Sequence, residues 1–320
     1  MPRLRKVHPG VDPGYRRVRA GSGFKYTDAD GAPLSQTERD RIVALFIPPA
    51  WRDVWISAAP NGHIQATGVD EAGRLQYLYH PSWSVGRDKG KYARALQLAK
   101  ALPRARARVT TSLRRDGLDR ERVLATAFRL LDQAALRVGS ERYLLRYGSR
   151  GLTTLRRRDA AVCGTVTSLR FPGKSGQRQS IEIDDADLAA AVALLVAGRP
   201  ASPLLAYERG SRRVPLTPKD VNAYVRTMTG GAFTAKDFRT LRGTILAAEK
   251  LAQLGAADAK RYRKRAEVLA VKAAATALGN TPAVAKSSYI DPRVFYRYRS
   301  GLVLDRSVSA ESAIRSLLLG

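Results

Sequence analysis

The chain has 320 residues, of which 56 are Lys or Arg and 28 are Asp or Glu, so its formal net charge is +28. This length fits two domains with ample material for a core, and such a charge opposes folding unless a polyanion neutralises it. The composition therefore favours a nucleic acid as partner. An anionic membrane surface is the alternative, although the sequence has no long apolar segment and no basic amphipathic anchor helix.

Metal ligands and cysteines are scarce in the sequence. The histidines, His8, His63 and His80, are scattered over the first quarter of the chain, and Cys163 is the single cysteine. This set predicts neither a metal cluster nor a disulfide framework. The lone cysteine, together with an N-terminus that lacks the apolar core of a signal peptide, indicates a reducing cytoplasm.

The first 90 residues have a sequence pattern typical of a small β-rich domain. Residues 1–15 are basic and rich in Gly and Pro, which predicts a loose tail, and from about residue 22 short β-prone runs alternate with turns. One helix is expected inside this region, because Ser35 followed by Glu38 forms a capping box. Residues 68–73 are typical of a hairpin turn.

A short aromatic run follows that turn. Tyr77 and Tyr79 alternate along a predicted strand and so share one face, with Gln76 beside them. Aromatic rings beside basic groups suit a nucleic-acid surface, and cross-strand packing accounts for the same rings equally well.

The basic stretch 84–94 is the best candidate for a linker or hinge, and beyond it the chain becomes mostly helical. The run ERVLATAFRLLDQAALRVG places Leu124, Ala127 and Leu131 on one helix face, and Gly139 is predicted to end that helix. Arg137 would then lie at a helix C-terminus, where a cation is favoured on dipole grounds alone.

The sequence RFPGKSGQ, residues 170–177, resembles a nucleotide phosphate loop only in part. The full pattern needs a further glycine where Ser168 stands, and it joins a strand to a helix. Here β-prone runs flank the turn on both sides, so a hairpin is expected, with Lys174 at its tip. Lys174 is either a solvated turn lysine or a ligand for a phosphate other than that of ATP.

A dense group of carboxylates, Asp184, Asp185 and Asp187, precedes the apolar run LAAAVALLV. Acidic residues before such a run are typical of a helix N-terminus, whose dipole they complement. We therefore interpret them as a helix start rather than as a two-metal nuclease site.

Three later helices have N-termini that can be recognised in the sequence. Thr217-Pro218 with Asp220, and Thr234 with Asp237, each combine an N-cap with an acid three residues on, and Asp258 opens a long basic helix that ends at Gly279. The second of these starts puts Arg239 in the first turns of its helix. Its guanidinium could there join the N-terminal amides in facing an anion.

A short helix is expected to begin at Thr281-Pro282 and to carry Tyr289. Taken alone, Tyr289 is better explained as a core or interface tyrosine than as a nucleophile.

Four stretches, AALRVGSERYL, RFPGKSG, AKDFRTLRG and LGNTPAVAKSSYIDP, occur in that order, and in order and wording they resemble the type IB DNA topoisomerases. The nearest resemblance is to the compact bacterial branch related to the poxvirus enzymes, and it also includes IPPAWRDVWI and GRLQYLYHPSW. It implies an α+β bilobed clamp. Residues 1–90 would form a small β-rich DNA-binding domain, and residues 91–320 a larger, mainly α-helical catalytic domain with a small β-sheet and hairpin.

The resemblance also implies the role of each catalytic residue. Tyr289 would be the nucleophile, Arg137 and Arg239 would bind the scissile phosphate, and Lys174 would be the general acid. Asn280 stands where many relatives carry a histidine, so its uncharged amide should stabilise the phosphate less strongly. The implied reaction is transient cleavage of one strand through a 3′-phosphotyrosine, followed by rotation and religation, without ATP, metal or any other cofactor.

The implied partner is duplex DNA, bound by a monomer associated with the nucleoid. The basic residues from Lys260 to Arg265 would either contact phosphates or form a solvated helix face. The implied DNA contacts outside the catalytic five are Gln76, Tyr77, Tyr79, Tyr143 and Lys236.

Two other functions remain as rivals. Tyrosine recombinases use a similar residue set, but many of them carry a histidine three residues before the second arginine, where this chain has Lys236. A non-catalytic architectural DNA-binding protein would satisfy the charge, yet it would have no reason to place four such residues in these contexts. The scarcity of ligands disfavours a metal nuclease.

Overall fold

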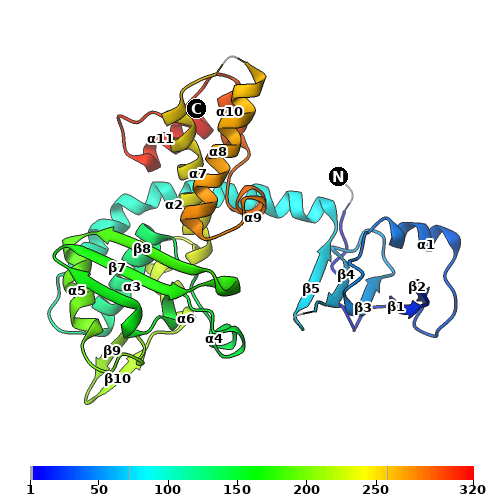
Figure 1. Cartoon of the computed structure of the whole chain (residues 1–320), viewed down its shortest axis with the longest axis horizontal. Coiled ribbons are helices and arrows are strands. Elements are labelled where there is room, and N and C mark those ends of the chain that lie inside the picture. Colours follow the sequence, from blue (N-terminus) through cyan, green and yellow to red (C-terminus); the bar gives the residue numbers. More distant parts are fainter. Residues whose placement is uncertain (1–2, 72, 258) are drawn as a thin grey trace. The chain divides into compact units, whose positions relative to one another are not determined.

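The computed structural model describes residues 3–71, 73–257 and 259–320, and the chain divides into two compact units, Met1–Gly90 and Lys91–Gly320 (Figure 1). The first unit is dominated by a β-sheet and the second by helices, with small sheets of its own. The expected α+β class is therefore confirmed.

The first unit is built on a five-stranded antiparallel sheet of order β2-β1-β3-β4-β5. Helix α1 (Gln36–Val43) begins as predicted, since the Ser35 side chain accepts a hydrogen bond from the Glu38 amide. Ile42 of α1 packs with Ile56 and other apolar side chains of the sheet to form a small core. The strands are β1 (Gly14–Ala20), β2 (Gly23–Thr27), β3 (Arg52–Ser57), β4 (Ile64–Val69) and β5 (Leu75–Tyr79).

The prediction of a loose N-terminal tail is wrong for the described residues that precede β1. Val7 is only 3% exposed, and its amide donates to Nδ1 of His63 over 3.1 Å. The Arg5 amide donates to the carbonyl of Asn61. Burial of Val7 and these bonds to the β3–β4 connection hold the segment against the sheet, which a composition rich in Gly and Pro cannot reveal.

The expected linker near residues 84–94 is helical. It lies within α2 (Pro81–Leu113), which runs through the boundary between the two units at residue 90. The boundary between the units does lie in the stretch predicted as a linker or hinge, but the backbone there is helical. A helix tolerates an isolated glycine, such as the two in this stretch, at a cost of only about 1 kcal/mol.

The second unit places its helices around one large hydrophobic core. Phe128 of α3 lies at its centre, with its ring edge-on to Phe238 at 5.3 Å and to Tyr224 at 6.4 Å. The remaining helices are α3 (Arg120–Ala134), α4 (Glu141–Tyr147), α5 (Ala186–Val196), α6 (Pro218–Thr229), α7 (Ala235–Leu254), α8 (Lys260–Leu278), α9 (Pro282–Ser288), α10 (Arg293–Arg299) and α11 (Ala310–Leu319).

Two small antiparallel sheets complete this unit. β6 (Ala160–Cys163), β7 (Val166–Pro172) and β8 (Arg178–Asp184) form a meander beside α3 and α5 (Figure 1), and β7 and β8 are joined by the short 3₁₀ turn η3 (Lys174–Gly176). The predicted hairpin at residues 170–177 is thus confirmed. A second hairpin, β9 (Ala206–Arg209) and β10 (Arg212–Pro215), was not predicted.

The helix starts at Thr217 and Thr234 are confirmed, and both residues form capping boxes with their acids. Helix α8 ends at Leu278 with Gly279 as its left-handed cap, also as predicted, whereas Asp258, expected to open it, lies outside the described residues. Within the described part of the chain no single helix is long and apolar enough to cross a membrane. Only α8 and α9 together reach that length and composition, with a 94° bend between them.

Candidate active site

Helix α7 places Arg239 at the centre of the second unit. Asp237 fixes the first turn of α7 through two hydrogen bonds. It accepts one from the Thr234 amide at 2.8 Å and one from Nε of Arg94 at 2.7 Å. Asp237 is almost fully buried, so this pairing removes the cost of an isolated carboxylate and locks α7 onto α2.

The Arg239 guanidinium is 5% exposed and binds the ends of two helices. It donates to the carbonyl of Ala135, which follows α3, at 2.6 Å, and to that of Leu278, the last residue of α8, at 2.8 Å. Carbonyls at helix C-termini have no partner within their own helix, and Arg239 supplies one. Both terminal nitrogens of Arg239 thus bind the C-terminal ends of two other helices, α3 and α8.

Arg137 does not lie at a helix end. Helix α3 stops at Ala134, with Ala135 as a left-handed cap (φ 48°), so the predicted end at Gly139 is wrong by several residues. The segment beyond has no regular secondary structure, and the carbonyl of Arg137 accepts a 2.8 Å hydrogen bond from the Leu152 amide. Gly139 serves a close approach instead, since a Cβ there would lie 3.1 Å from the backbone of Gly151.

Asn280 meets Arg137 at the C-terminus of α8. Its amide donates to the carbonyl of Ala275, and its side-chain Oδ1 accepts from Nη2 of Arg137, which also lies 3.3 Å from the carbonyl of Gly279. The Nδ2 group is buried and has no hydrogen-bond partner among the described residues. Buried donors are normally satisfied, so this group lacks a partner that a ligand could supply.

Tyr289 is the C-cap of α9, directly after the helix expected to carry it. Gly243, one turn beyond Arg239 on α7, allows its close approach, because a Cβ on Gly243 would lie 2.8 Å from the carbonyl oxygen of Tyr289. The next residue, Thr244, accepts from the Asp291 amide at 3.1 Å. Sequence reasoning missed Gly243, although an isolated glycine inside a helical pattern is a signal of tight packing.

The electrostatics of the site act on the Tyr289 phenol. Burial alone would raise its pKa, but the positive charge of Arg239, a hydrogen bond from it, and the charges of Arg137 and Lys236 outweigh burial, and the pKa is lowered. The Arg239 guanidinium lies 4.9 Å from the centre of the tyrosine ring. Burial and the charge of Arg239 also lower the pKa of Arg137, partly offset by Tyr289.

Lys174 lies apart from this group. It occupies η3 at the tip of the β7–β8 hairpin, is exposed, and makes no hydrogen bond to any described residue. The structure thus brings Arg137, Arg239, Asn280 and Tyr289 together and leaves the lysine on a projecting turn.

Two further DNA contacts were predicted in this unit, Lys236 and Tyr143. The structure places Lys236 close to the site, whereas Tyr143 makes no hydrogen bond, ion pair or ring contact with the described residues of the site. Lys236 is exposed in the first turn of α7 and acts on Tyr289 through its charge. Tyr143 lies on α4, half exposed, with its ring 5.7 Å from that of Tyr147.

The predicted contacts in the first unit lie on the edge strand β5. Tyr77 and Tyr79 do share a face, with their rings stacked 6.0 Å apart, and Tyr77 is 44% exposed. The Gln76 amide donates to Asp70 in the preceding turn at 2.8 Å. The exposed ring of Tyr77 on this edge strand can stack on a flat ligand.

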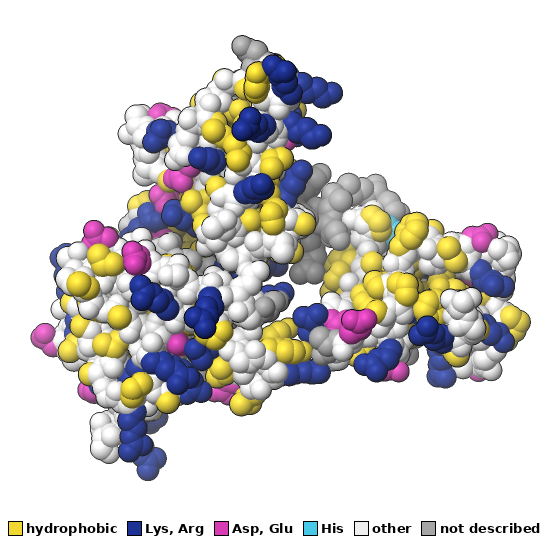
Figure 2. Space-filling model, in the orientation of Figure 1, with side chains coloured by type: hydrophobic (Ala, Val, Ile, Leu, Met, Phe, Trp, Pro, Cys, Tyr) yellow, Lys and Arg dark blue, Asp and Glu magenta, His cyan; other side chains and the backbone are white. Residues whose placement is uncertain are grey.

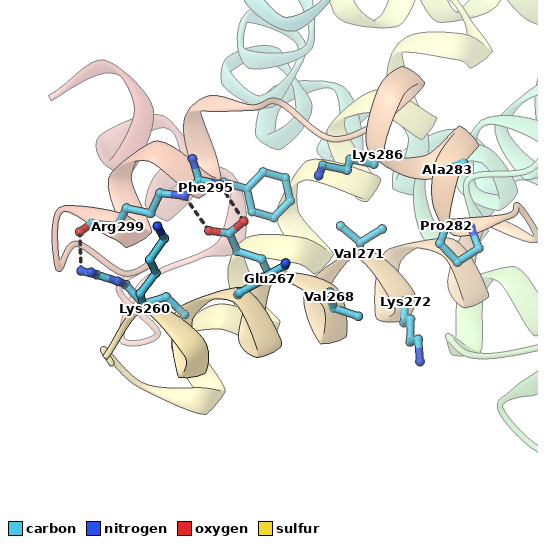
Figure 3. Close-up of a pocket in the computed structure, with 12 residues that line it drawn as sticks. Lys260, Glu267, Val268, Val271, Lys272, Pro282, Ala283, Lys286, Phe295 and Arg299 are labelled. Atoms are coloured by element: carbon cyan, nitrogen blue, oxygen red, sulfur yellow. Dashed lines mark hydrogen bonds and ion pairs between the residues drawn. The ribbon is translucent and has the colours of Figure 1, made fainter. Parts of the chain in front are cut away.

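A groove of about 820 Å³ runs beside α8, α9 and α10 (Figure 3). Its floor is apolar, its rim is basic, and its one acid, Glu267, is held by Arg299 through two 2.7 Å bonds. Figure 2 shows the dark blue Lys and Arg side chains spread over this part of the surface. The basic lining residues are Lys260, Arg263, Lys264, Lys272, Lys286 and Arg299.

The clustered carboxylates are structural. Asp185 is the N-cap of α5, as predicted, and accepts from the Leu188 amide, while Arg129 binds its other oxygen. Among the described residues no three His, Cys, Asp or Glu side chains come together as metal ligands.

Comparison with known proteins agrees with this geometry. Residues 81–300 match the family model described as eukaryotic DNA topoisomerase I, catalytic core, and residues 23–70 match that of the bacterial DNA topoisomerase IB N-terminal domain. The chain is 29% identical to DNA topoisomerase 1B of Acanthamoeba polyphaga mimivirus over 285 residues, 87% of this chain and 85% of the relative. The chain therefore belongs to the type IB DNA topoisomerase family, in its bacterial branch, and is a DNA topoisomerase.

Proposed function

We propose that this topoisomerase relaxes supercoiled duplex DNA by cutting one strand with Tyr289, letting the free end rotate, and resealing the strand without ATP or a metal ion. The observation that carries the proposal is the lowered pKa of the Tyr289 phenol, which is caused by Arg239, Arg137 and Lys236. A phenol with a lowered pKa is a better nucleophile at neutral pH than an isolated tyrosine.

In the proposed step, the Tyr289 phenol gives its proton to water, its Oη attacks a DNA phosphorus atom, and the bond from that phosphorus to the 5′ oxygen breaks. Arg137 and Arg239 bind the non-bridging oxygens, where negative charge develops, and the free Nδ2 donor of Asn280 binds one of them as well. The product is a phosphodiester to tyrosine, similar in energy to the one broken. Religation is therefore the same step in reverse and needs no energy source.

The 5′ oxygen leaves as a strongly basic alkoxide unless it is protonated as it departs. We assign this proton to Lys174, whose exposed ammonium on the hairpin tip is available to DNA. An exposed position suits this role, since the acid must reach a leaving group on the substrate rather than a protein atom.

We further propose that the enzyme acts as a monomer on DNA in the cytoplasm. Tyr77, Tyr79 and Gln76 in the first unit, and Tyr143 and Lys236 in the second, would contact bases or backbone. The basic rim of the groove beside α8 would add phosphate contacts. With this many cations, affinity should fall steeply as salt rises.

The test is relaxation of a supercoiled plasmid in excess EDTA without ATP. Wild type should relax the plasmid and Tyr289→Phe should not, while both still bind DNA. Tyr296→Phe is the matched control, since Tyr296 is exposed on the neighbouring helix α10, and it should retain activity. Relaxation by Tyr289→Phe would remove Tyr289 from the mechanism. Strand exchange between two duplexes, without relaxation, would favour a recombinase.

A further inference from the structure

The side chain of Gln179 lies between the two glycines that directly precede Lys174 and Asn280. A Cβ placed on Gly173 would be 2.9 Å from Cγ of Gln179, and one on Gly279 would be 2.7 Å from its Nε2 and 2.9 Å from its Cδ. At both positions only the absence of a side chain makes room for the glutamine. Gln179 therefore spans the space between the hairpin turn and the end of α8.

Gln179 occupies a position where its strand otherwise buries apolar side chains. It pairs with Phe171 across the β7–β8 ladder and so faces the same side as Ile181 and Ile183. Phe171 and Ile183 are buried. A polar side chain at the end of an inward-facing row needs a reason. Here it lines a small cavity, of about 20 Å³, with Arg137 and Arg239.

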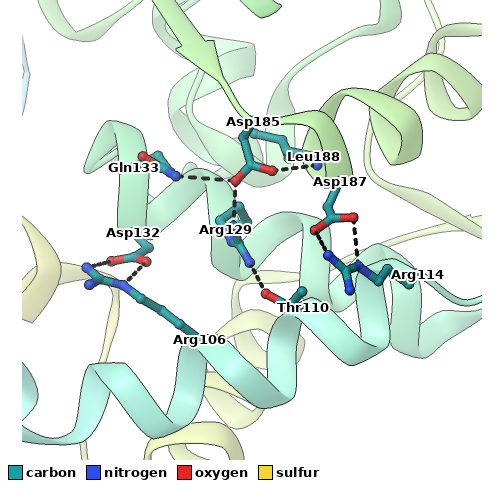
Figure 4. Close-up of polar contacts among 9 residues, drawn as sticks. All are labelled: Arg106, Thr110, Arg114, Arg129, Asp132, Gln133, Asp185, Asp187 and Leu188. Carbon is teal, nitrogen blue, oxygen red and sulfur yellow. Dashed lines mark hydrogen bonds and ion pairs between the residues drawn. The ribbon is translucent and has the colours of Figure 1, made fainter. Parts of the chain in front are cut away.

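The hairpin has a second anchor at its base. Asp185, directly after β8, is held by Arg129, which also donates to Thr110 at 2.6 Å, and Asp187 is held by both nitrogens of Arg114 (Figure 4). These bonds fix the base of β8 to α2 and α3. These bonds do not reach the tip, η3. The side chain of Gln179 packs against Gly173, next to the tip, and so is the group that can position it.

We propose that Gln179 is a positioning residue that acts through Lys174: by filling the space between Gly173 and Gly279 it holds the hairpin tip at the height from which Lys174 reaches the leaving 5′ oxygen. This rests on the proposed role of Lys174 as general acid. Gln179 itself donates no proton. A shorter side chain at this position should let the hairpin tip move toward α8. The Lys174 ammonium would then lie farther from the leaving 5′ oxygen.

The test compares two duplexes that differ in one atom, at a cleavage site first mapped with wild type. In one the scissile phosphate carries the normal 5′ oxygen, and in the other a bridging 5′ sulfur. A thiol has a pKa of about 8.5, against about 16 for water and similar hydroxyl groups, so sulfur leaves without a proton. The measured quantity is the ratio of the single-turnover cleavage rate with sulfur to that with oxygen.

A general loss of structure lowers both rates by one factor and leaves this ratio unchanged. Lys174→Ala should raise the ratio strongly. Gln179→Ala should lower the oxygen rate about 10- to 100-fold and leave the sulfur rate close to wild type, and Gln179→Asn, one methylene shorter, should give an intermediate ratio. Gln177→Ala, an exposed neighbour on the same turn, is the control and should keep the wild-type ratio.

The outcomes separate the two proposals. If Lys174→Ala raises the ratio and both Gln179 variants keep the wild-type value, the positioning role of Gln179 is overturned while the general acid stands. If Lys174→Ala leaves the ratio unchanged, the acid is assigned to the wrong residue and the role of Gln179 fails with it.

Discussion

Two cations that the proposed mechanism places at one phosphodiester have opposite surroundings. Arg239 is 5% exposed and bound to two helix ends, whereas Lys174 is exposed on a turn. The helical frame, consisting of α7, α8, α9 and residues 135–139, is held by packing and satisfied hydrogen bonds. The hairpin of β7 and β8, which carries Lys174, is held at its base by Arg129 and Arg114 and, under its tip, by Gln179. In the proposed mechanism, phosphate binding and nucleophile activation would therefore belong to the folded core, and proton donation to a projection from it.

The largest expected effects come from exchanging these two cations for alanine. Arg239→Ala and Lys174→Ala should each slow cleavage, the first by about 1,000-fold, since it removes a donor from the developing charge. Only Arg239→Ala should also destabilise the protein, by about 2–4 kcal/mol, because the carbonyls of Ala135 and Leu278 lose their donor. Lys174→Ala should change stability by less than about 0.5 kcal/mol.

Urea unfolding of the three proteins, alongside single-turnover cleavage, checks this difference. Arg239→Lys is the informative control, since an ammonium keeps the charge but cannot reach both carbonyls in a fixed fork. Equal stability of Arg239→Ala and wild type would mean that the guanidinium is no part of the frame.

A smaller effect is expected from adding a single methyl group to the frame. Gly243→Ala should slow cleavage about 10- to 100-fold. The new Cβ would lie 2.8 Å from the carbonyl oxygen of Tyr289 and 3.1 Å from the Cβ of Tyr289, and it would displace this tyrosine. Elsewhere in a helix the same change stabilises by about 1 kcal/mol. Single-turnover cleavage and filter binding should show lost chemistry with unchanged DNA affinity. Normal cleavage would show that α9 can move without cost.

The same two regions differ in how far the sequence predicts them. The starts of α6 and α7 follow from local chemistry, because a threonine and an acid three residues on satisfy each other without help from the rest of the chain. The hairpin turn around Lys174 follows equally from Pro172 and two glycines. The proposed catalytic residues follow from motif resemblance rather than from spacing.

Long-range contacts were not predictable. Gly139 was expected to end α3, but its missing side chain allows the close approach of Gly151, and the helix ends at Ala134, where Arg239 binds the carbonyl of the cap residue Ala135. No local pattern encodes that bond, since 104 residues separate its ends. Gln179 is similar: its contact with Gly279 exists only once β8 and α8 are folded together.

A modest effect on the frame is expected from one exposed charge. Lys236 lowers the pKa of Tyr289, so Lys236→Gln should raise that pKa toward its ordinary value and leave less phenolate at any pH below it. The rising limb of the cleavage pH profile should move to higher pH, with a loss of about 2- to 5-fold near neutrality, reduced further by salt. Lys250→Gln is the control, about 21 Å further along the same helix. Identical profiles for all three proteins would exclude this charge from the site.

The smallest effect on chemistry is expected where basic residues act in binding alone. Lys260→Gln with Lys264→Gln removes two cations from the rim of the groove beside α8, which shares α9 with the nucleophile but contains none of the catalytic residues. If each cation neutralises one phosphate, the slope of log affinity against log salt should fall by about 1.8 for the pair. Cleavage at saturating DNA should be unchanged, because the frame around Tyr289 keeps every contact. Titrations at several salt concentrations measure the slope. An unchanged slope would make this face a solvated helix surface, and a slower chemical step at saturation would extend the catalytic frame to the groove.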